Sequence, residues 1–584
     1  MRMQQLMVAG AAFALVAACA QTARQTDPPA LPQPAETEAV ADMAVVTSSA
    51  ARQERSKAAA ALQAQRELAA RRAAPPPVTT QAYLAAPMSA DVLGGARYAP
   101  MEQDRERYAR IDDHGVQRVQ ETPVSTFSID VDTGAYANVR RFLRQGTLPR
   151  EDAVRVEELI NYFDYGYAPP KDAAQPFSTH VELAPTPWNA NTQLLRIGLQ
   201  GWKPQGALPP SNLVFLVDVS GSMNDPDKLP LVKSALMLLT REMGARDRIS
   251  LVVYAGASGV VLEPTPADRH GTIAAALERL QAGGSTNGAS GIQLAYAMAR
   301  QAFIKDGINR VLLATDGDFN VGTTDFEQLK DWVERERQSG VALSTLGFGG
   351  GNYNDRLMEQ LADAGNGNYH YIDSLEEARR ALVHARAATL HTIAKDVKIQ
   401  VEFNPAVVAE YRLIGYENRA LQREDFSNDQ VDAGEIGAGH NVTALYEIAL
   451  VGSGGQRIDA LRYAPARPVN HSGEIGHLRL RYKRPNEETS RLIEQPILRS
   501  QMRASLDQAS ESLRFAAAVA AFGQKLRGGR YTGDYGYDQL SQLARAARGS
   551  DDQGWRGEFL GLVQLASGLT PVPARAAVSQ EIGG

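Results

Sequence analysis

The chain has a single cysteine among its 584 residues. One thiol cannot form a disulfide within the chain, and it cannot by itself support a Cys-based zinc site or an iron–sulfur cluster. Basic residues are also not in excess, because 61 Lys and Arg stand against 67 Asp and Glu, for a formal net charge of −6. This balance is typical of an ordinary globular protein and argues against nucleic acid as a partner.

No stretch at the N-terminus is long enough for a membrane-spanning helix. Leu6–Ala18 is almost entirely apolar. Its length of about 13 residues falls short of the roughly 20 that a transmembrane helix needs, but it matches the hydrophobic region of a signal peptide. We therefore expect residues 1–18 to be a signal peptide.

The lone cysteine ends this apolar run. Leu15-Val16-Ala17-Ala18-Cys19 resembles a bacterial lipobox, and the resemblance implies cleavage before Cys19 and lipidation of its thiol. Ala20, where an Asp would imply retention, implies passage to the outer membrane. We expect a lipid-anchored outer-membrane protein that faces the periplasm. The alternative is a plain secretory signal with an incidental cysteine.

Aromatic residues are scarce in the segment that follows. Residues 20–110 contain no Phe and no Trp, and proline recurs up to Pro75-Pro76-Pro77. Such a composition cannot bury enough apolar surface to offset the entropy of ordering. Residues 19–123 are therefore predicted to be a disordered tether, which as a flexible coil of about 100 residues would span on the order of 55 Å.

Folded structure is expected to begin near Val124. Phe127–Thr133 alternates like a strand and is followed by two amphipathic helices. Two further strand-like runs, 177–183 and 193–199, complete a predicted N-terminal region over 124–205. Asp130 and Asp132 are compatible with a metal loop, but the favoured interpretation is a strand end with Asp132 or Thr133 as a helix N-cap.

The pattern changes between residues 210 and 393, where buried strands alternate with amphipathic helices. The strands are predicted from near-continuous apolar runs at 213–219, 249–254, 310–315 and 341–348. This alternation predicts a doubly wound α/β domain with a parallel sheet covered on both faces. Ligands of such sheets bind at the carboxyl ends of the strands.

Five oxygen-bearing side chains follow these strands or lie in a Gly-rich loop: Asp218, Ser220, Ser222, Thr286 and Asp316. Two carboxylates and three hydroxyls are hard ligands, and we expect them to converge on one edge of the sheet. That set suits Mg²⁺, or Mn²⁺ or Ca²⁺ in its place, with one coordination position left open. The alternative is that these residues only cap helices.

These residues resemble the metal-ion-dependent adhesion site of von Willebrand factor type A (VWA) domains, namely DxSxS, a loop Thr and a strand-terminal TDG. The resemblance implies that Ser220, Ser222 and Thr286 supply oxygens to the metal. It further implies that Asp218 and Asp316 bind the metal directly or through water. The sixth position would take a Glu or Asp carboxylate from a protein partner.

The resemblance extends beyond this domain. The blocks FSIDVDTGAYANVRRFL, RVEELINYFDY, LLATDGDFNVG, TLGFGGGNYND and LIGYENR are similar to a group of bacterial VWA lipoproteins, over most of the chain after Val124. Strand-like runs at 397–403, 442–450 and 477–482 predict a β-sandwich over 394–484. We expect its strands to pair with those of the 124–205 region.

The C-terminal part is predicted to be helical over 485–572, followed by a disordered tail over 573–584. Leu506, Leu513 and Ala520 have heptad spacing. A later helix is predicted from Trp555, Phe559, Leu562 and Val563.

Other chemistries have weaker support. Gly347–Asn352 invites a dinucleotide-binding interpretation, but Asn352 stands where the third glycine belongs. His384 and His391 lie about 10 Å apart if helical, too far to share one metal ion, and are expected to be surface or packing residues. No GxSxG or HExxH motif occurs. We therefore expect no enzyme activity and no small-molecule substrate.

The expected function is an envelope-anchored module that binds an acidic residue of another protein through a Mg²⁺-completed site. One alternative is a structural or assembly scaffold in which the metal merely ties loops together. A third possibility, a subunit of an AAA ATPase, conflicts with the signal sequence.

Overall fold

A computed structural model of the chain describes residues 105–318, 326–459 and 473–571. The predicted signal peptide, Cys19 and the C-terminal tail lie outside the described residues, as does the predicted tether up to residue 104. In the described part, no helix combines the length and the hydropathy that crossing a bilayer requires.

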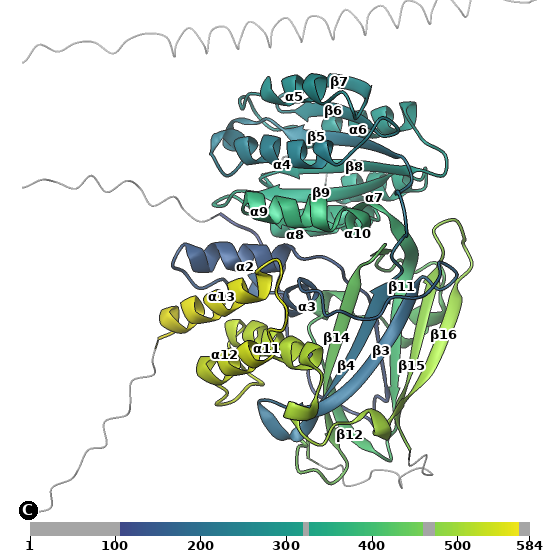
Figure 1. The fold of residues 1–584 in the computed structure, drawn as a ribbon, viewed down its shortest axis with the longest axis vertical. Coiled ribbons are helices and arrows are strands. Elements are labelled where there is room, and N and C mark those ends of the chain that lie inside the picture. Colours follow the sequence, from purple (N-terminus) through teal and green to yellow (C-terminus); the bar gives the residue numbers. More distant parts are fainter. Residues whose placement is uncertain (1–104, 319–325, 460–472, 572–584) are drawn as a thin grey trace, which may run out of the picture. The chain divides into compact units, whose positions relative to one another are not determined.

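The α/β domain contains a six-stranded sheet in the order β10-β9-β8-β5-β6-β7 (Figure 1). All neighbours are parallel except β6 and β7, which are antiparallel. The strands are β5 (Ser211–Asp218), β6 (Arg248–Tyr254), β7 (Ser258–Pro266), β8 (Ile308–Thr315), β9 (Ala342–Phe348) and β10 (Tyr369–Ile372). Every residue of β5 and β8 is buried, which explains their uninterrupted apolar character.

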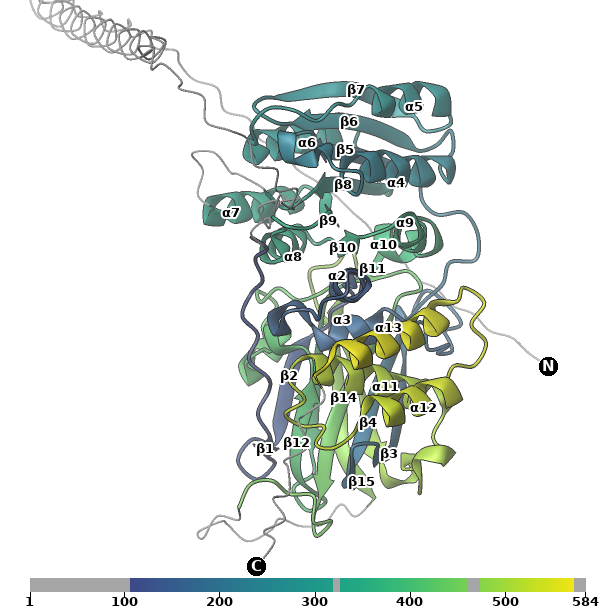
Figure 2. The same ribbon diagram turned by 90° about the vertical axis from the view of Figure 1, so that its left-hand side faces the viewer.

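Helices cover both faces of this sheet (Figure 2). One face packs against α4 (Leu229–Arg241), α5 (His270–Glu278) and α9 (Leu375–Arg379). The other packs against α6 (Gly288–Gln301), α7 (Phe326–Arg337) and α8 (Asp355–Ala364). The doubly wound prediction is therefore confirmed, although β7 and β10 were not predicted.

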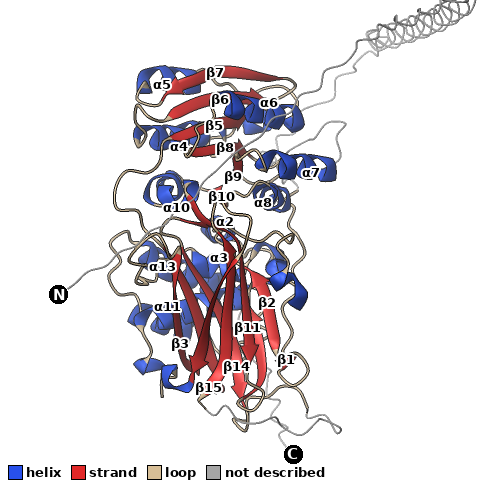
Figure 3. Cartoon of the chain, turned by 90° about the vertical axis from the view of Figure 1, so that its right-hand side faces the viewer, coloured by secondary structure: helices blue, strands red, loops and turns tan. Residues whose placement is uncertain are grey.

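A β-sandwich forms the second part of the fold, with two sheets around one apolar core (Figure 3). One sheet has the order β1-β12-β14-β4-β3. The other has the order β13-β11-β15-β16, with β2 also paired to β11. Their bounds are β1 (Gln117–Arg118), β2 (Val124–Ser128), β3 (Phe177–Thr186), β4 (Asn189–Gly201), β11 (Thr392–Phe403), β12 (Val408–Ile414), β13 (Ile436–Gly437), β14 (Asn441–Leu450), β15 (Glu474–Lys483) and β16 (Arg491–Leu498).

Strands from both sides of the α/β domain share these sheets. β14 is antiparallel to β4, with Val442 opposite Leu199 and Ile448 opposite Gln193. The prediction that the two strand regions pair is confirmed. The α/β domain is thus inserted between β4 and β11 of one sandwich. β16 belongs to the same sandwich, so the prediction of a purely helical region over 485–572 is wrong at this strand.

Five helices cover the outer face of the sheet that contains β4 and β14. They are α2 (Gly134–Arg144), α3 (Val156–Asn161), α11 (Glu511–Leu526), α12 (Tyr537–Ala546) and α13 (Trp555–Leu569). Their apolar side chains pack with Leu194 and Leu445 of the sheet. Leu506 lies in a short 3-10 turn before α11, so the predicted heptad does not run along one helix.

Packing begins upstream of Val124, contrary to the predicted extent of the tether. The backbone N–H of Arg105 donates to the Gly351 carbonyl at 2.8 Å, and β1 pairs with β12. The predicted strand at 127–133 is also shorter than expected, because β2 ends at Ser128. Residues 105–123 are therefore part of the folded body.

Candidate metal site at the edge of the α/β sheet

Three chain segments meet at the carboxyl edge of the α/β sheet. Asp218 ends β5, Asp316 follows the neighbouring strand β8, and Thr286 lies in the loop before α6. The loops are joined by backbone hydrogen bonds: the Gly221 N–H donates to the Gly284 carbonyl at 3.1 Å, and the Gly283 N–H donates to the Val219 carbonyl at 2.8 Å. The fold thus brings together the three segments that carry the predicted ligands.

Asp218 is fully buried and held by neutral donors. Its Oδ1 accepts the Ser220 N–H at 2.9 Å. Its Oδ2 accepts Thr315 Oγ1 at 2.8 Å and Tyr254 Oη at 3.2 Å. Burial raises the pKa of the Asp218 carboxyl to about 6, because desolvation disfavours the charged form. A bound cation would offset this cost.

The two serines have the spacing of neighbouring ligands of one ion. Ser220 Oγ lies 3.1 Å from Ser222 Oγ. Two oxygens at right angles, each about 2.1 Å from Mg²⁺, are about 3.0 Å apart. Ser222 and Thr286 are half-buried, so the site is reachable from solvent. The donors present therefore fit a hard divalent cation.

Asp316 has partners that the sequence did not reveal. Its Oδ1 accepts the Asp318 N–H at 3.1 Å. Its Oδ2 accepts Lys228 Nζ and Asn352 Nδ2, each at 3.1 Å. Lys228 precedes α4 and Asn352 lies in the turn after β9, and neither residue was predicted to lie at the site. The Gly-rich sequence around Asn352 was the one available signal.

The Gly-rich turn after β9 serves close packing. A Cβ at Gly347 would overlap the ring and hydroxyl of Tyr353. Gly349 has φ of +68°, and a Cβ there would lie 2.5 Å from Cγ and Cε of Lys228. The glycines are therefore explained by these contacts, and a dinucleotide is not needed to account for them.

Asp130 and Asp132 do not have the roles considered for them. Asp130 Oδ1 accepts the Asp132 N–H at 2.8 Å, and Asp132 Oδ1 accepts the Tyr369 N–H at 2.8 Å. Both carboxylates pair with Arg419: Asp130 Oδ2 lies 3.4 Å from its Nε, and Asp132 Oδ2 lies 3.5 Å from its Nη2. Thr133, the residue at the N-cap position of α2, makes no side-chain capping bond. The predicted N-cap is wrong, and the charge of both carboxylates is balanced by Arg419.

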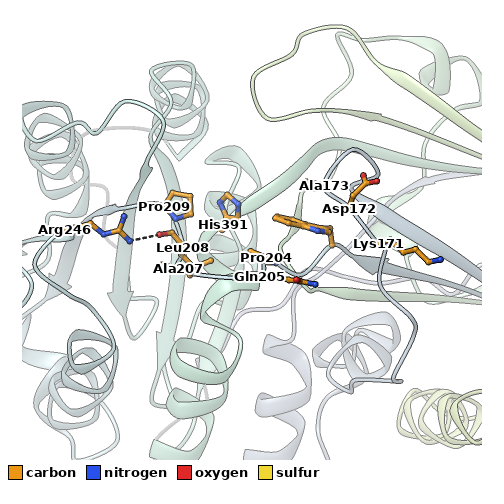
Figure 4. A pocket seen from close by; sticks show the side chains of 11 residues that line it. Lys171, Asp172, Ala173, Pro204, Gln205, Ala207, Leu208, Pro209, Arg246 and His391 are labelled. Atoms are coloured by element: carbon orange, nitrogen blue, oxygen red, sulfur yellow. Dashed lines mark hydrogen bonds between the residues drawn. The ribbon is translucent and has the colours of Figure 1, made fainter.

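The two histidines lie apart from this edge. The His384 ring packs edge-on against Trp555, with centroids 6.1 Å apart. His391 borders a cavity of about 610 Å³ together with Trp202 and Arg246 (Figure 4). Pro209, also in its lining, precedes β5, so this cavity lies at the opposite end of the strand from Asp218. Over the described ranges, no group of three or more His, Cys, Asp or Glu residues is arranged to hold a metal.

Comparison with known proteins assigns the chain to a family. A relative named "Uncharacterized protein YfbK", from Escherichia coli strain K12, is 48% identical over 476 residues, which cover 80% of this chain and 82% of the relative. The chain belongs to the YfbK family. The YfbK C-terminal family model matches residues 388–569, the von Willebrand factor type A domain model matches 212–383, and a further von Willebrand factor model matches 102–196.

More distant relatives of this YfbK family member match smaller shares of the chain. The protein sll0103 of Synechocystis is 31% identical over 169 residues, covering 29% of this chain and 39% of the relative. Human inter-alpha-trypsin inhibitor heavy chain H3 is 29% identical over 170 residues, which cover 27% of this chain and 19% of the relative. A solved von Willebrand factor type A structure from Catenulispora acidiphila has 15% identity and a TM-score of 0.39, covering 69% of this chain and 91% of that chain. Because the von Willebrand factor type A model matches residues 212–383, the α/β domain is a VWA domain, a kind of domain that generally mediates protein–protein interaction.

Proposed function

We propose that this YfbK family member binds an acidic residue of a partner protein through a divalent cation at the carboxyl edge of its VWA sheet. The observation that carries this proposal is the 3.1 Å spacing of the Ser220 and Ser222 hydroxyls beside the buried carboxylates of Asp218 and Asp316. Mg²⁺ is the proposed ion, with Mn²⁺ or Ca²⁺ as substitutes, because all the donors are hard oxygens.

Ser220, Ser222 and Thr286 would hold the ion, and Asp218 and Asp316 would balance its charge. The ion would supply a positive centre on which a partner's Glu or Asp carboxylate replaces a bound water. Charge and geometry together would make this recognition specific for an acidic side chain.

Binding is favoured over a scaffold role for the metal. The Gly221 N–H and the Gly283 N–H already join the loop after β5 to the loop before α6 through backbone hydrogen bonds, and Asp316 is held by Lys228 and Asn352. The loops therefore have links that do not depend on an ion. An ion that is not needed to hold the loops together can keep one coordination position for a carboxylate of a partner protein.

Binding is also favoured over catalysis. The groups that contact Asp218 and Asp316 through described hydrogen bonds are hydroxyls, amides and one ammonium group. None of them is an imidazole or carboxylate placed to act as a general base on a metal-bound water. We therefore propose that the protein has no enzyme activity of its own.

The proposal places the protein in the bacterial envelope. Cys19 would carry the lipid anchor, and the folded body would face the periplasm from the outer membrane. This part rests on the N-terminal sequence. It predicts that the full chain incorporates radiolabelled palmitate and that Cys19→Ala abolishes the incorporation.

The binding mechanism is tested by using the protein to capture partner proteins from envelope extracts, with and without EDTA. The full chain is compared with Asp218→Ala, Thr286→Ala and the control Asp268→Ala, an exposed residue beyond β7 at the other end of the sheet. We expect EDTA and the two site variants to abolish capture while the unfolding temperature in EDTA stays close to that of the wild type. Equal capture in EDTA would contradict the proposal, and unfolding of both site variants would favour the scaffold role.

A further inference from the structure

A lysine ammonium group lies inside the proposed ion site. Lys228 is 5% exposed, and its Nζ lies 3.1 Å from Asp316 Oδ2 and 3.2 Å from Asn352 Oδ1. Asp225 is a weaker neighbour, with Oδ2 at 3.6 Å. Lysine is almost never buried to this degree without a charged partner. The pairing with Asp316 therefore explains why this ammonium group can be buried.

The stem of Lys228 fits a channel made by the Gly-rich turn. Gly349 has φ of +68°, and a Cβ there would come within 2.5 Å of the lysine side chain. The Gly349 carbonyl accepts Tyr371 Oη at 2.7 Å, and the Gly351 N–H donates to Glu106 at 2.8 Å. The turn is thus anchored on both sides, and the lysine has a defined place in the site.

Lys228 occupies a position on Asp316 that a cation would otherwise use. Each carboxylate oxygen has two lone pairs. On Asp316, Oδ2 accepts both Lys228 and Asn352, and Oδ1 accepts the Asp318 N–H. One lone pair of Oδ1 is left by these bonds. An ion that binds Asp316 must use that position, act through water, or displace the ammonium group.

We propose that Lys228 is a resident cation of this site that competes with the divalent ion for Asp316 and so weakens ion binding. This inference rests on the proposed function, because it concerns the same ion. A positive charge a few ångströms from the ion opposes binding through Coulomb repulsion. The lysine keeps Asp316 paired when no ion is bound, and it makes the bound ion exchangeable.

The test is Mn²⁺ binding to the full chain. Binding is measured as the decrease in the electron paramagnetic resonance signal of free Mn²⁺. Lys228→Met removes the charge, and Lys228→Gln removes it while keeping a polar end. The matched control is Lys233→Met, in the helix α4 that Lys228 precedes; among its described hydrogen bonds, the Lys233 Nζ contacts only the carbonyls of Glu278 and Leu280. We expect both Lys228 variants to bind Mn²⁺ about tenfold more tightly than the wild type, and Lys233→Met to match the wild type.

The outcomes separate this inference from the proposed function. Equal or weaker Mn²⁺ binding in both Lys228 variants overturns the role of Lys228 and leaves the metal site standing. Absence of Mn²⁺ binding in the wild type and in all variants overturns the metal site itself. Binding only after removal of Lys228 supports the competition. Thermal unfolding in EDTA gives a second readout, in which the Lys228 variants should be less stable than Lys233→Met because Asp316 has lost its cation.

Discussion

Two groups of buried carboxylates in this protein differ in how their charge is balanced. At the edge of the VWA sheet, Asp218 and Asp316 are surrounded by hydroxyls, amides and one lysine. The second group, which we call the arginine–carboxylate cluster, lies where α8 meets the region around α3. It consists of Asp130, Asp132, Glu158, Asp355 and Glu359 with Arg155 and Arg419.

The negative charges of the arginine–carboxylate cluster are balanced by its own two arginines. Arg155 is 1% exposed and contacts Glu158, Asp355 at 2.5 Å and Glu359 at 3.6 Å. An arginine fork satisfies several carboxylate oxygens at once and cannot lose its proton in a protein. The cluster has more carboxylates than the sheet edge, and yet among the described residues no group of three or more His, Cys, Asp or Glu is arranged to hold a metal. The number of acidic residues is thus a poor guide to a metal site, and the number of uncommitted oxygens is a better one.

The cluster also joins the inserted domain to the rest of the fold. Asp355 and Glu359 belong to α8 of the VWA domain, and Arg155 immediately precedes α3 beside the sandwich. Breaking the cluster should therefore affect stability, whereas changing the sheet edge should affect ligand binding. The following predictions test that division, from the largest expected effect to the smallest.

Arg155→Ala is expected to be the most damaging change. It would leave Asp355 and Glu158 buried without their main cation, and breaking a buried ion pair costs about 3–5 kcal/mol. Urea unfolding measures the loss. The control is Arg300→Ala, which removes a half-exposed pair with Glu336 and should cost no more than about 1 kcal/mol. Equal losses in the two variants would contradict the division.

Glu157, next to the cluster, should make stability depend on pH. Burial, with Glu417 as a neighbouring charge, raises the pKa of Glu157 to about 7. The folded state then holds a proton that the unfolded state, with a pKa of about 4.3, releases first. The stabilising contribution is present below about pH 4.3 and is lost as the pH rises through 7.

Glu157→Gln removes this dependence. Between about pH 4.5 and pH 8, the free energy of unfolding of Glu157→Gln should rise relative to that of the wild type by up to about 3 kcal/mol. This is the energy that corresponds to a pKa shift of this size. Chemical unfolding at both pH values measures the gain. A constant difference between the two proteins across this range would show that Glu157 does not titrate there.

Mg²⁺ should stabilise the protein through the sheet edge alone. An ion present at a concentration of about 100 times its dissociation constant raises the free energy of unfolding by about 2.7 kcal/mol. Thermal unfolding with Mg²⁺ and with EDTA should show this gain in the wild type and in Asp130→Asn, and should not show it in Asp218→Asn. Loss of the gain in Asp130→Asn would mean that the cluster, and not the edge, binds the ion.

Asn352→Ala should have the smallest effect. It removes one neutral donor from Asp316 and one neutral acceptor from Lys228, and it leaves the Lys228–Asp316 pair and the Asp318 amide in place. A hydrogen bond of this kind contributes about 1 kcal/mol, measurable as a lower unfolding free energy in EDTA. A loss as large as that of Arg155→Ala would show that the edge, too, depends on a tightly coupled network.

A strand was predicted where its burial is continuous, as in β5 and β8, or alternates along the strand, as in β15. β5 and β8 are buried on both sides, so their composition alone marks them. β7 is a half-exposed edge strand and β10 has four residues, so neither has a clear period. β16 is largely exposed, which hid it within a region predicted as helical.

The candidate site was predictable to the same extent. Asp218, Ser220 and Ser222 are close in sequence, and Asp316 follows a recognisable strand, so strand-end reasoning brings them together. Lys228 and Asn352 were missed because no rule of local sequence links them to Asp316. Lys228 is 88 positions from Asp316, and its side chain reaches it only past the bare backbone of Gly349.

Local side-chain patterns are therefore sufficient to identify the parallel sheet, the oxygen-bearing side chains at its edge and the short apolar run before Cys19. They are sufficient because burial and strand direction act on each segment separately. The register of β4 against β14, the pairing of Asp130 and Asp132 with Arg419, and the position of Lys228 beside Asp316 depend on distances between remote segments. Such distances are set by the packing of the whole fold, because a buried charge selects its partner from whatever the tertiary structure places within a few ångströms.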